Sequence, residues 1–332
     1  MSDMIRKEAN ASVSSREKKG RTIPAETTAE TAAATDSANS SPKREPAKKP
    51  KKDIRRVKTL PPMSVIVPFI MKDRIGSSNL LQDRINVIKL EKYIKEKQTE
   101  DALVNISMMH VLIAAYVRLV SQRPAINRFI RGQRVYTRKS VEVSLTIKRE
   151  MSLDSPDTVV KVLLQPDATI YDVYDALNKA IVDYRANPGG DFDDTARWLS
   201  YIPSVILRGV IGFLSFLDYF GFLPRFLTGV SPFHCSMFIT SMGSLGIPAI
   251  YHHLYDFGTC PVFIAFGSKQ RRYEVSPDGS VSKNQFIDLK FTLDERICDG
   301  YYYAKALRYL KRVLNDPWIL DLPPEQVVSD IR

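Results

Sequence analysis

The sequence predicts an α/β fold, and three observations support this prediction. Stretches with apolar residues at helical spacing alternate with short β-branched runs that have the pattern of hairpin strands. No glycine-rich nucleotide-binding fingerprint follows any of these runs. The 332 residues are 44% hydrophobic and 26% charged, which is enough for one sizeable domain or two small ones.

Residues 1–57 are predicted to be a disordered basic tail. They are nearly free of aromatic residues, so they cannot bury enough apolar surface to offset the entropy of ordering. Residues 1–60 carry 15 Lys and Arg against 8 Asp and Glu, so +7 of the chain's net charge of +11 lies there. Only +4 remains on the body, and no specific nucleic-acid-binding face is expected. Two interpretations of Lys43–Lys58 stay open: a solubilising linker, or a segment that contacts anionic surfaces.

Cysteine usage predicts a reducing compartment, and we expect a cytoplasmic protein. Cys235, Cys260 and Cys298 are too few and too scattered for a disulfide framework, and no Cys-x-x-Cys pair suggests a metal site. Residues Met1–Ser14 show no apolar core of a secretory signal.

One folded domain is expected over residues 58–332. Its first part opens with an apolar, β-branched run at Met63–Ile70. Ser107 is a plausible N-cap of a strongly amphipathic helix. His110 lies within this helix and is expected to be a core histidine whose hydrogen bonds are satisfied. Strands are expected at 82–88, 134–136, 141–148 and 159–164, and helices at 90–97, 107–120 and 169–184.

Residues 198–230 are the most apolar part of the chain. The uncharged runs 198–207 and 209–217 are too short to cross a bilayer, which takes about 20 residues. Three interpretations stay open: helices that are buried or lie at a subunit interface, an apolar lid or acyl-chain channel, or a peripheral membrane contact.

The C-terminal part is expected to hold a strand that enters a glycine-rich turn at 236–246, a further strand at 262–267, and a hairpin that ends near Leu293. A helix is expected at 304–314. Between hairpin and helix lies a polar cluster, which is either a charged connection or a site held at a strand end. The adjacent His252 and His253 lack a third ligand, so metal binding is not expected, and a catalytic base from this pair is an alternative.

The polar cluster Asp294-Glu295-Arg296-Ile297-Cys298-Asp299-Gly300 resembles the Asp-His-Arg-x-x-Asp-Gly signature of dihydrolipoamide acyltransferases and the related signature of chloramphenicol acetyltransferase. Glu295 takes the place of the catalytic His. The resemblance implies a two-layer α/β sandwich of the chloramphenicol acetyltransferase type, with a mixed, largely antiparallel sheet covered by helices. It also implies a homotrimer with its active site between subunits, coenzyme A as cofactor, and an acyl-CoA as substrate with an acceptor that the sequence does not identify.

Roles for single residues follow from the same resemblance. The turn at 236–246 is similar to the motif whose Ser hydroxyl stabilises the oxyanion, and that Ser falls on Thr240, with Ser241 as second candidate. Asp299 is expected to be structural and held by Arg74, with Arg296 and Gly300 supporting the loop. The family's Gly-Leu-x-x-Pro segment is replaced by residues 151–156, which puts the usual channel contacts in doubt.

A Glu base changes the chemistry at position 295. The pKa of an ordinary Glu is about four units below the pKa of a thiol, whereas the pKa of His is about two units below it. This difference between Glu and His corresponds to roughly 3 kcal/mol. An apolar pocket closes this gap by destabilising the carboxylate. Two hypotheses therefore remain: a CoA-dependent acyltransferase with Glu295 as base, or a catalytically silent trimeric homologue that acts as a scaffold, binding or membrane-surface protein.

Overall fold

The fold is described from a computed structural model, which covers residues 54–100, 104–148, 157–186 and 197–332. Most of the predicted tail, the segment 151–156 and residues 187–196 lie outside the described residues. Residues Ile54–Arg56 form strand β1, so the described secondary structure begins four residues before residue 58, the expected start of the domain.

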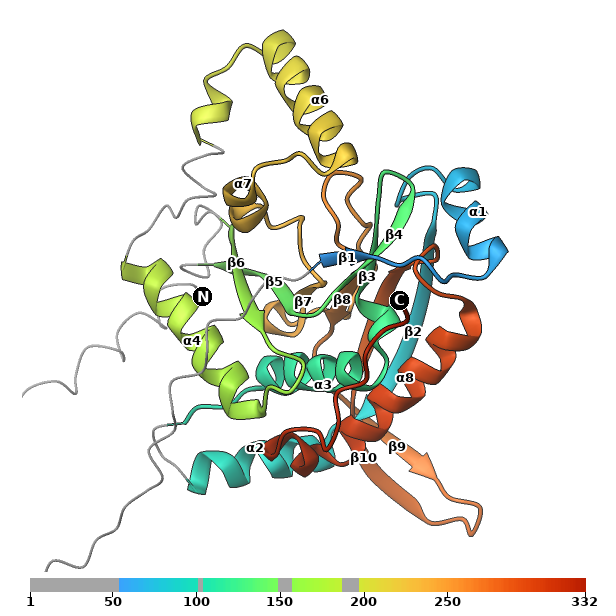
Figure 1. Cartoon of the computed structure of the whole chain (residues 1–332). Coiled ribbons are helices and arrows are strands. Elements are labelled where there is room, and N and C mark those ends of the chain that lie inside the picture. The colour runs from blue at the N-terminus through green and yellow to red at the C-terminus, as the bar shows by residue number, and fades with distance from the viewer. Residues whose placement is uncertain (1–53, 101–103, 149–156, 187–196) are drawn as a thin grey trace, which may run out of the picture. The chain divides into compact units, whose positions relative to one another are not determined.

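The main sheet contains seven strands and is mixed (Figure 1). Its order is β2-β10-β8-β7-β5-β6, and β9 pairs with β10 outside this path. The pairs β5–β7 and β7–β8 are parallel, and the other pairs are antiparallel. The strands are β2 (Ser78–Asn86), β5 (Val141–Lys148), β6 (Asp157–Leu164), β7 (Met237–Ser241), β8 (Val262–Phe266), β9 (Gln270–Val275) and β10 (Val281–Asp294). The predicted mixed, largely antiparallel sheet is confirmed.

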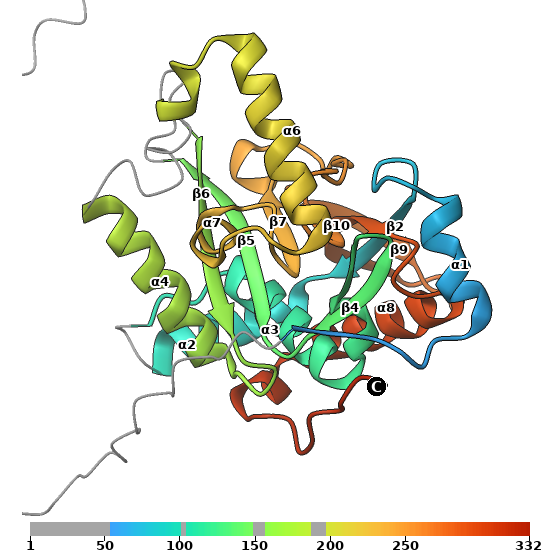
Figure 2. The same cartoon turned by 45° about the horizontal axis from the view of Figure 1, so that its top comes forward.

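Helices form the second layer, on one face of this sheet (Figure 2). They are α2 (Ile88–Glu100), α3 (Met108–Gln122), α4 (Ile170–Ala186) and α8 (Gly300–Asn315). Helix α3 is buried along nearly its whole length, and its neighbours α4 and α8 pack against it. Ser107 caps α3 together with His110, whose Nδ1 accepts a hydrogen bond of 3.0 Å from the Ser107 amide. The two-layer α/β sandwich is therefore confirmed.

Alternation along the strands separates the two faces of the sheet. Met237 and Ile239 of β7 belong to the helix-covered core, whereas Phe238 belongs to a smaller cluster with Phe263 on the opposite face. The loop between β7 and β8 lies over that opposite face, because Thr292 Oγ1 donates a 2.5 Å hydrogen bond to His252 O. Thr240 and Thr292 thus belong to the face opposite the layer of α2, α3, α4 and α8, where a site can form.

A small second sheet has the order β1-β4-β3, with β3 (Arg128–Arg131) and β4 (Arg134–Arg138) forming a hairpin. Helix α1 (Pro62–Ile70) precedes β2, so the apolar run at its start is helical. Pro62 at the first helical position supports this start, because its missing N–H is not needed there.

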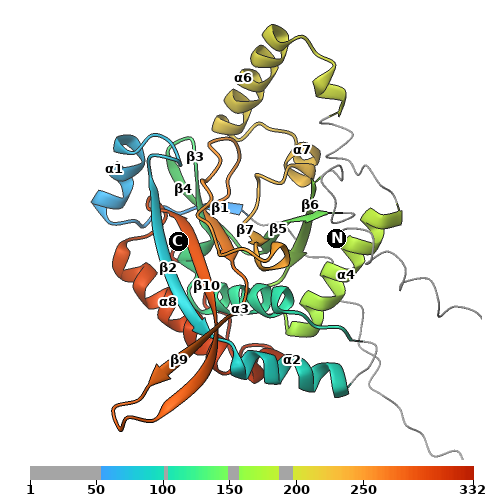
Figure 3. The ribbon, with the colours of Figure 1, turned by 180° about the vertical axis from the view of Figure 1, so that it is seen from behind.

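The apolar region 198–230 forms α6 (Ser204–Phe220) and α7 (Arg225–Val230). Helix α6 points away from the main sheet, as Figure 3 shows from behind. Asp218 is its only buried residue, so the interpretation of buried helices is wrong for this chain on its own. Among the described residues, no helix combines the length and the apolar character needed to cross a membrane.

Candidate active site

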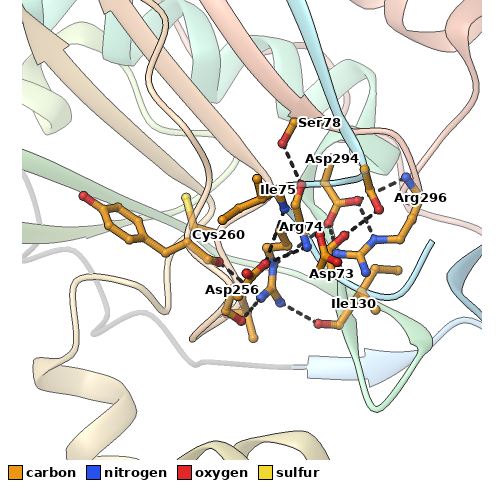
Figure 4. Close-up of polar contacts among 12 residues, drawn as sticks. Asp73, Arg74, Ile75, Ser78, Ile130, Asp256, Cys260, Asp294 and Arg296 are labelled. Atoms are coloured by element: carbon orange, nitrogen blue, oxygen red, sulfur yellow. Dashed lines mark hydrogen bonds and ion pairs between the residues drawn. The ribbon is translucent and has the colours of Figure 1, made fainter.

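A fully buried carboxylate, Asp294, ends the central strand β10 (Figure 4). Its two oxygens accept hydrogen bonds from Nε and Nη2 of Arg296, both at 2.8 Å. The Arg74 Nε lies 4.0 Å from the same carboxylate. Two arginines therefore share one buried carboxylate, a geometry that fixes the loop after β10.

Arg74 ties three segments together. Its Nη2 donates to Ile130 O at 2.9 Å and its Nη1 donates to Asp256 O at 2.6 Å, while its backbone amide donates to the Asp256 carboxylate at 2.8 Å. Burial lowers the pKa of Arg74, and the charge of Asp294 opposes that shift. The expected pairing of Arg74 with Asp299 is not observed, because the guanidinium turns inward to Asp294.

Asp299 and Gly300 begin helix α8 instead. The Asp299 side chain accepts a hydrogen bond of 2.7 Å from the Tyr302 amide, which makes Asp299 the N-cap. Both residues are exposed. Of the predicted supporting residues, Arg296 and Arg74 therefore belong to the buried network, whereas Asp299 supports the helix.

Glu295 lies between these two groups with its side chain exposed. Its backbone amide donates to Ser77 O at 2.9 Å, which continues the pairing between β10 and the chain before β2. The carboxylate therefore points outward while Asp294 and Arg296 point inward. The apolar pocket that a Glu base requires is not formed around Glu295 by the described part of this chain.

Thr240 is buried at the end of β7, and its hydroxyl makes no hydrogen bond to any described residue. Ser241 is half-buried and accepts a 3.4 Å hydrogen bond from the Ser244 amide. The following turn passes close to the end of β8, because a Cβ on Gly243 would lie 2.8 Å from Gly267 O. Glycine is thus needed for the turn, and the Thr240 hydroxyl stays available as a donor.

The structure does not bring Glu295 and Thr240 together within one chain. Thr240 pairs with Ala265, and Ala265 pairs with Lys290, so Glu295 lies five residues further along β10 and two strands away. With about 3.3 Å per residue and 4.8 Å per strand, the two residues are roughly 20 Å apart. A base and an oxyanion donor must both reach one acyl carbon, which this distance prevents.

A cavity of ≈ 280 Å³ lies beside the Asp294 network and at the base of α6. Sequence reasoning missed five of its charged residues, which are Lys72, Asp73, Arg131, Asp218 and Asp256. Asp218 lies 3.1 Å from His234 Nε2 and 3.7 Å from Arg131 Nη2. Asp218 is the only acidic residue in the apolar stretch 198–230, and a lone acid in such a stretch is the signal that indicates a buried partner.

The histidine pair is divided between two environments. His252 stacks on Phe263 with ring centroids 4.4 Å apart, and burial followed by the charge of His253 lowers its pKa. His253 is exposed, and its Nδ1 lies 3.1 Å from Leu254 O. The described ranges contain no group of three or more His, Cys, Asp or Glu residues that could hold a metal ion.

Comparisons with known proteins give structural relatives only. No protein-family model matches the chain, and no curated protein matches it. The chain is similar to a probable dihydrolipoamide acetyltransferase from Listeria monocytogenes, with 12% identity, 76% of this chain and 89% of that chain covered, and a TM-score of 0.49. The dihydrolipoamide acetyltransferase of Azotobacter vinelandii gives 13% identity, coverage of 78% and 88%, and a TM-score of 0.49. A chloramphenicol acetyltransferase gives 11% identity, coverage of 76% and 94%, and a TM-score of 0.45.

Proposed function

We propose that this protein is a CoA-dependent acyltransferase that works as a homotrimer in the cytoplasm. In this proposal, Glu295 of one subunit and Thr240 of the next form one site. The observation that carries it is the separation of roughly 20 Å between these two residues within one chain. A rotational ring of identical subunits can place the exposed Glu295 loop of one chain over the free Thr240 hydroxyl of its neighbour.

The proposed reaction has one base and one oxyanion donor. Glu295 takes the proton of a thiol or hydroxyl acceptor, whose oxygen or sulfur attacks the thioester carbonyl of acyl-CoA. The Thr240 hydroxyl donates to the oxyanion that forms, an interaction worth roughly 3–4 kcal/mol in acyl transfer. When the carbonyl re-forms, the CoA thiolate leaves and regains the proton from Glu295. A neighbouring subunit that covers Glu295 would exclude water and make the carboxylate a better base.

Coenzyme A supplies the activated thioester in this reaction. The cavity of ≈ 280 Å³ beside Arg296 is too small for the whole of such a substrate, and neither Glu295 nor Thr240 lines it. The three free cysteines support the proposed cytoplasmic location, because disulfides are rare there.

Acyl-CoA turnover by single variants and by their mixture tests the proposal. We expect Glu295→Gln and Thr240→Val each to lose more than about a hundredfold in turnover, and Thr240→Ser to keep most of it. Co-assembled Glu295→Gln and Thr240→Val chains should regain about a quarter of wild-type turnover, since one in four interfaces of a random ring pairs two intact residues. Wild-type turnover by Glu295→Gln would show that Glu295 is not the base. A mixture of the two variants without activity would contradict a site shared between subunits.

A second candidate function is a catalytically silent protein that docks on a membrane surface. The observation that favours it is the orientation of α6. Its polar residues Ser215 and Asp218 line the cavity on the body, and Tyr219 donates to Gln133 at 3.0 Å. Its apolar residues face outward: Ile206, Phe213, Phe216 and Phe220 are all more than half exposed.

The charges near α6 suit an anionic lipid surface. Arg197, Arg208 and Arg225 are exposed, and Asp218, the only acidic residue in 198–230, is buried. Exposed Trp198 and Tyr201 belong to the residue types enriched at bilayer interfaces. An apolar helix face flanked by arginines is the pattern of peripheral membrane contact.

Flotation with anionic and zwitterionic vesicles tests this candidate. We expect the wild type to float with anionic vesicles, and Phe213→Asp/Phe216→Asp to reduce partitioning more than about tenfold. Val275→Asp/Val281→Asp on the β9–β10 hairpin makes the same charge change at two exposed apolar residues and should leave flotation unchanged. A wild type that stays unbound, or an α6 variant that changes the oligomer's mass in sedimentation, would contradict the membrane contact.

A further inference from the structure

Two segments in the described part of the chain place a serine hydroxyl beside the histidine three residues later. Ser107 Oγ lies 2.8 Å from His110 Nδ1, and Ser231 Oγ lies 2.8 Å from His234 Nδ1. Ser107 and His110 cap the start of helix α3. Ser231 and His234 follow the end of α7, where no helix begins, so helix capping does not explain their contact.

The two histidines differ at the second ring nitrogen. Nε2 of His234 lies 3.1 Å from Asp218 Oδ1. Burial lowers the pKa of His110, and the only side chain that opposes this shift in the described part of the chain is the amide of Asn178. An aspartate beside one ring nitrogen keeps the proton there, which leaves the other nitrogen as an acceptor for the serine proton. Ser231, His234 and Asp218 thus have the order nucleophile, base and acid of a serine hydrolase, with the two ring nitrogens exchanged.

A tight turn at residues 231–234 fixes the hydroxyl against the imidazole. The His234 amide donates a 3.4 Å hydrogen bond to Ser231 O, and Pro232 at the second position of the turn presets the backbone angle φ. Lys161 Nζ donates to Ser231 O at 3.2 Å and to His234 O at 2.5 Å. The contact between Ser231 and His234 is therefore held by the tertiary fold and not only by their closeness in sequence.

Burial increases along the three side chains, from the nucleophile to the acid and base. Ser231 is half-buried, whereas His234 and Asp218 are only 4% and 7% exposed. Burial lowers the pKa of His234, the charge of Asp218 opposes this shift, and the charges of Lys161 and Arg131 add to it. His234 is therefore neutral at physiological pH, as a general base must be. A substrate can reach Ser231 from the side of α7, since this helix has no buried residue.

We propose that Ser231, His234 and Asp218 form a second catalytic site, which hydrolyses activated acyl esters and thioesters. His234 lies three residues before β7, at the end of that strand away from Thr240, and the site does not rest on the function proposed above. Ser231 Oγ attacks the acyl carbon while its proton passes to His234 Nδ1. The bond to the leaving alcohol or thiol then breaks, and the leaving group takes this proton. Water cleaves the acyl–Oγ bond with His234 again as base, which releases a carboxylic acid and restores Ser231.

Modification of the full chain by diisopropyl fluorophosphate, mapped by mass spectrometry, tests the nucleophile without any acyl substrate. We expect one adduct per chain, on Ser231, and none on Ser107, which is exposed and contacts a histidine at the same distance. His234→Gln should slow the modification at least about a hundredfold, whereas the matched variant His110→Gln should leave it unchanged. An unmodified Ser231, or equal modification of Ser107 and Ser231, would overturn the proposal.

Hydrolysis of p-nitrophenyl acetate tests the activity with a variant that changes little else. Ser231→Ala removes one half-buried hydroxyl and should abolish both the initial burst of nitrophenol and the acyl adduct on residue 231. Ser107→Ala is the matched control and should keep both. A burst of wild-type size from Ser231→Ala would show that Ser231 is not the nucleophile.

Asp218 acts through His234 and is a positioning residue. The rate of Ser231 modification should rise with pH as His234 loses its proton, with an inflection below pH 6.5 because the pKa of His234 is lowered. Asp218→Asn removes the charge that raises this pKa, so the inflection should move to lower pH while the rate falls at least about tenfold. An inflection that stays in place in Asp218→Asn would contradict the role of Asp218.

Discussion

Asp294 and Arg296 form a bidentate ion pair, with both N–O distances at 2.8 Å and both side chains almost completely excluded from solvent. The two residues are neighbours on either side of Glu295. Glu295 begins the turn that follows β10, in which the Ile297 amide donates to Asp294 O at 3.3 Å. Its side chain is exposed between the two inward-facing residues of the pair.

Removal of the shared carboxylate should destabilise the fold strongly. Asp294→Ala leaves Arg296 and Arg74 buried without their common partner, and breaking such a buried pair costs about 3–5 kcal/mol. Urea unfolding measures the change. The matched control is Arg84→Ala, which breaks an ion pair to Asp288 in which Arg84 is partly exposed, and should cost less than about 1 kcal/mol. Equal losses in both variants would contradict the structural role of Asp294.

His110 should make stability depend on pH. Burial lowers the pKa of His110 to about 4, against an ordinary value of 6.5. The unfolded chain then binds more protons than the folded chain between pH 4 and 6.5, so stability is lost as the pH falls through this window. His110→Gln should flatten the free energy of unfolding over this range by roughly 3 kcal/mol at most. The exposed His253 is the control. An unchanged slope after His110→Gln, or an equal flattening after His253→Gln, would refute this account.

Asp299 should act as a helix cap and not as the partner of an arginine. Asp299→Ala should lower the free energy of unfolding by about 1 kcal/mol, because the Tyr302 amide loses its acceptor. Asp299→Ser keeps a capping oxygen without the charge and should recover most of the loss, which thermal unfolding can measure. A serine variant as unstable as the alanine variant would point to a role for the charge.

The turn after Thr240 should tolerate no side chain at Gly243. A Cβ there would meet the backbone oxygen of Gly267 at 2.8 Å, so Gly243→Ala should destabilise the protein by about 1–3 kcal/mol. Gly209 in α6 has open space around it, and Gly209→Ala should stabilise the helix by up to about 1 kcal/mol. Denaturation curves of the two variants should therefore shift in opposite directions.

Periodicity predicted most elements of the fold. Val141–Lys148 alternates between apolar and polar residues and forms β5 with the predicted bounds. Helix α8 begins earlier than predicted, at Gly300, because Asp299 caps it. The mixed sheet followed from the resemblance to acyltransferases and is confirmed by the observed strand order.

Relations between remote residues could not be predicted in the same way. A motif fixes spacing along the chain, whereas the distance between Glu295 and Thr240 depends on the register of three strands. The inward turn of Arg74 depends on carbonyl oxygens of Ile130 and Asp256, which no side-chain pattern reveals. Amphipathic spacing in α6 defines an apolar face but does not say whether that face meets the body or the outside.

The central place of β10 has a consequence for synthesis of the chain. β10 separates β2 from β8 in the sheet, yet it is the last strand to be made, about 200 residues after β2. Until residues 281–294 leave the ribosome, β2 lacks β10, its one partner strand in the described part of the chain, and its backbone donors and acceptors stay unpaired. Such late, long-range pairing is slow and exposes strand edges to aggregation. We therefore expect a nascent chain that stops before residue 281 to depend on chaperones.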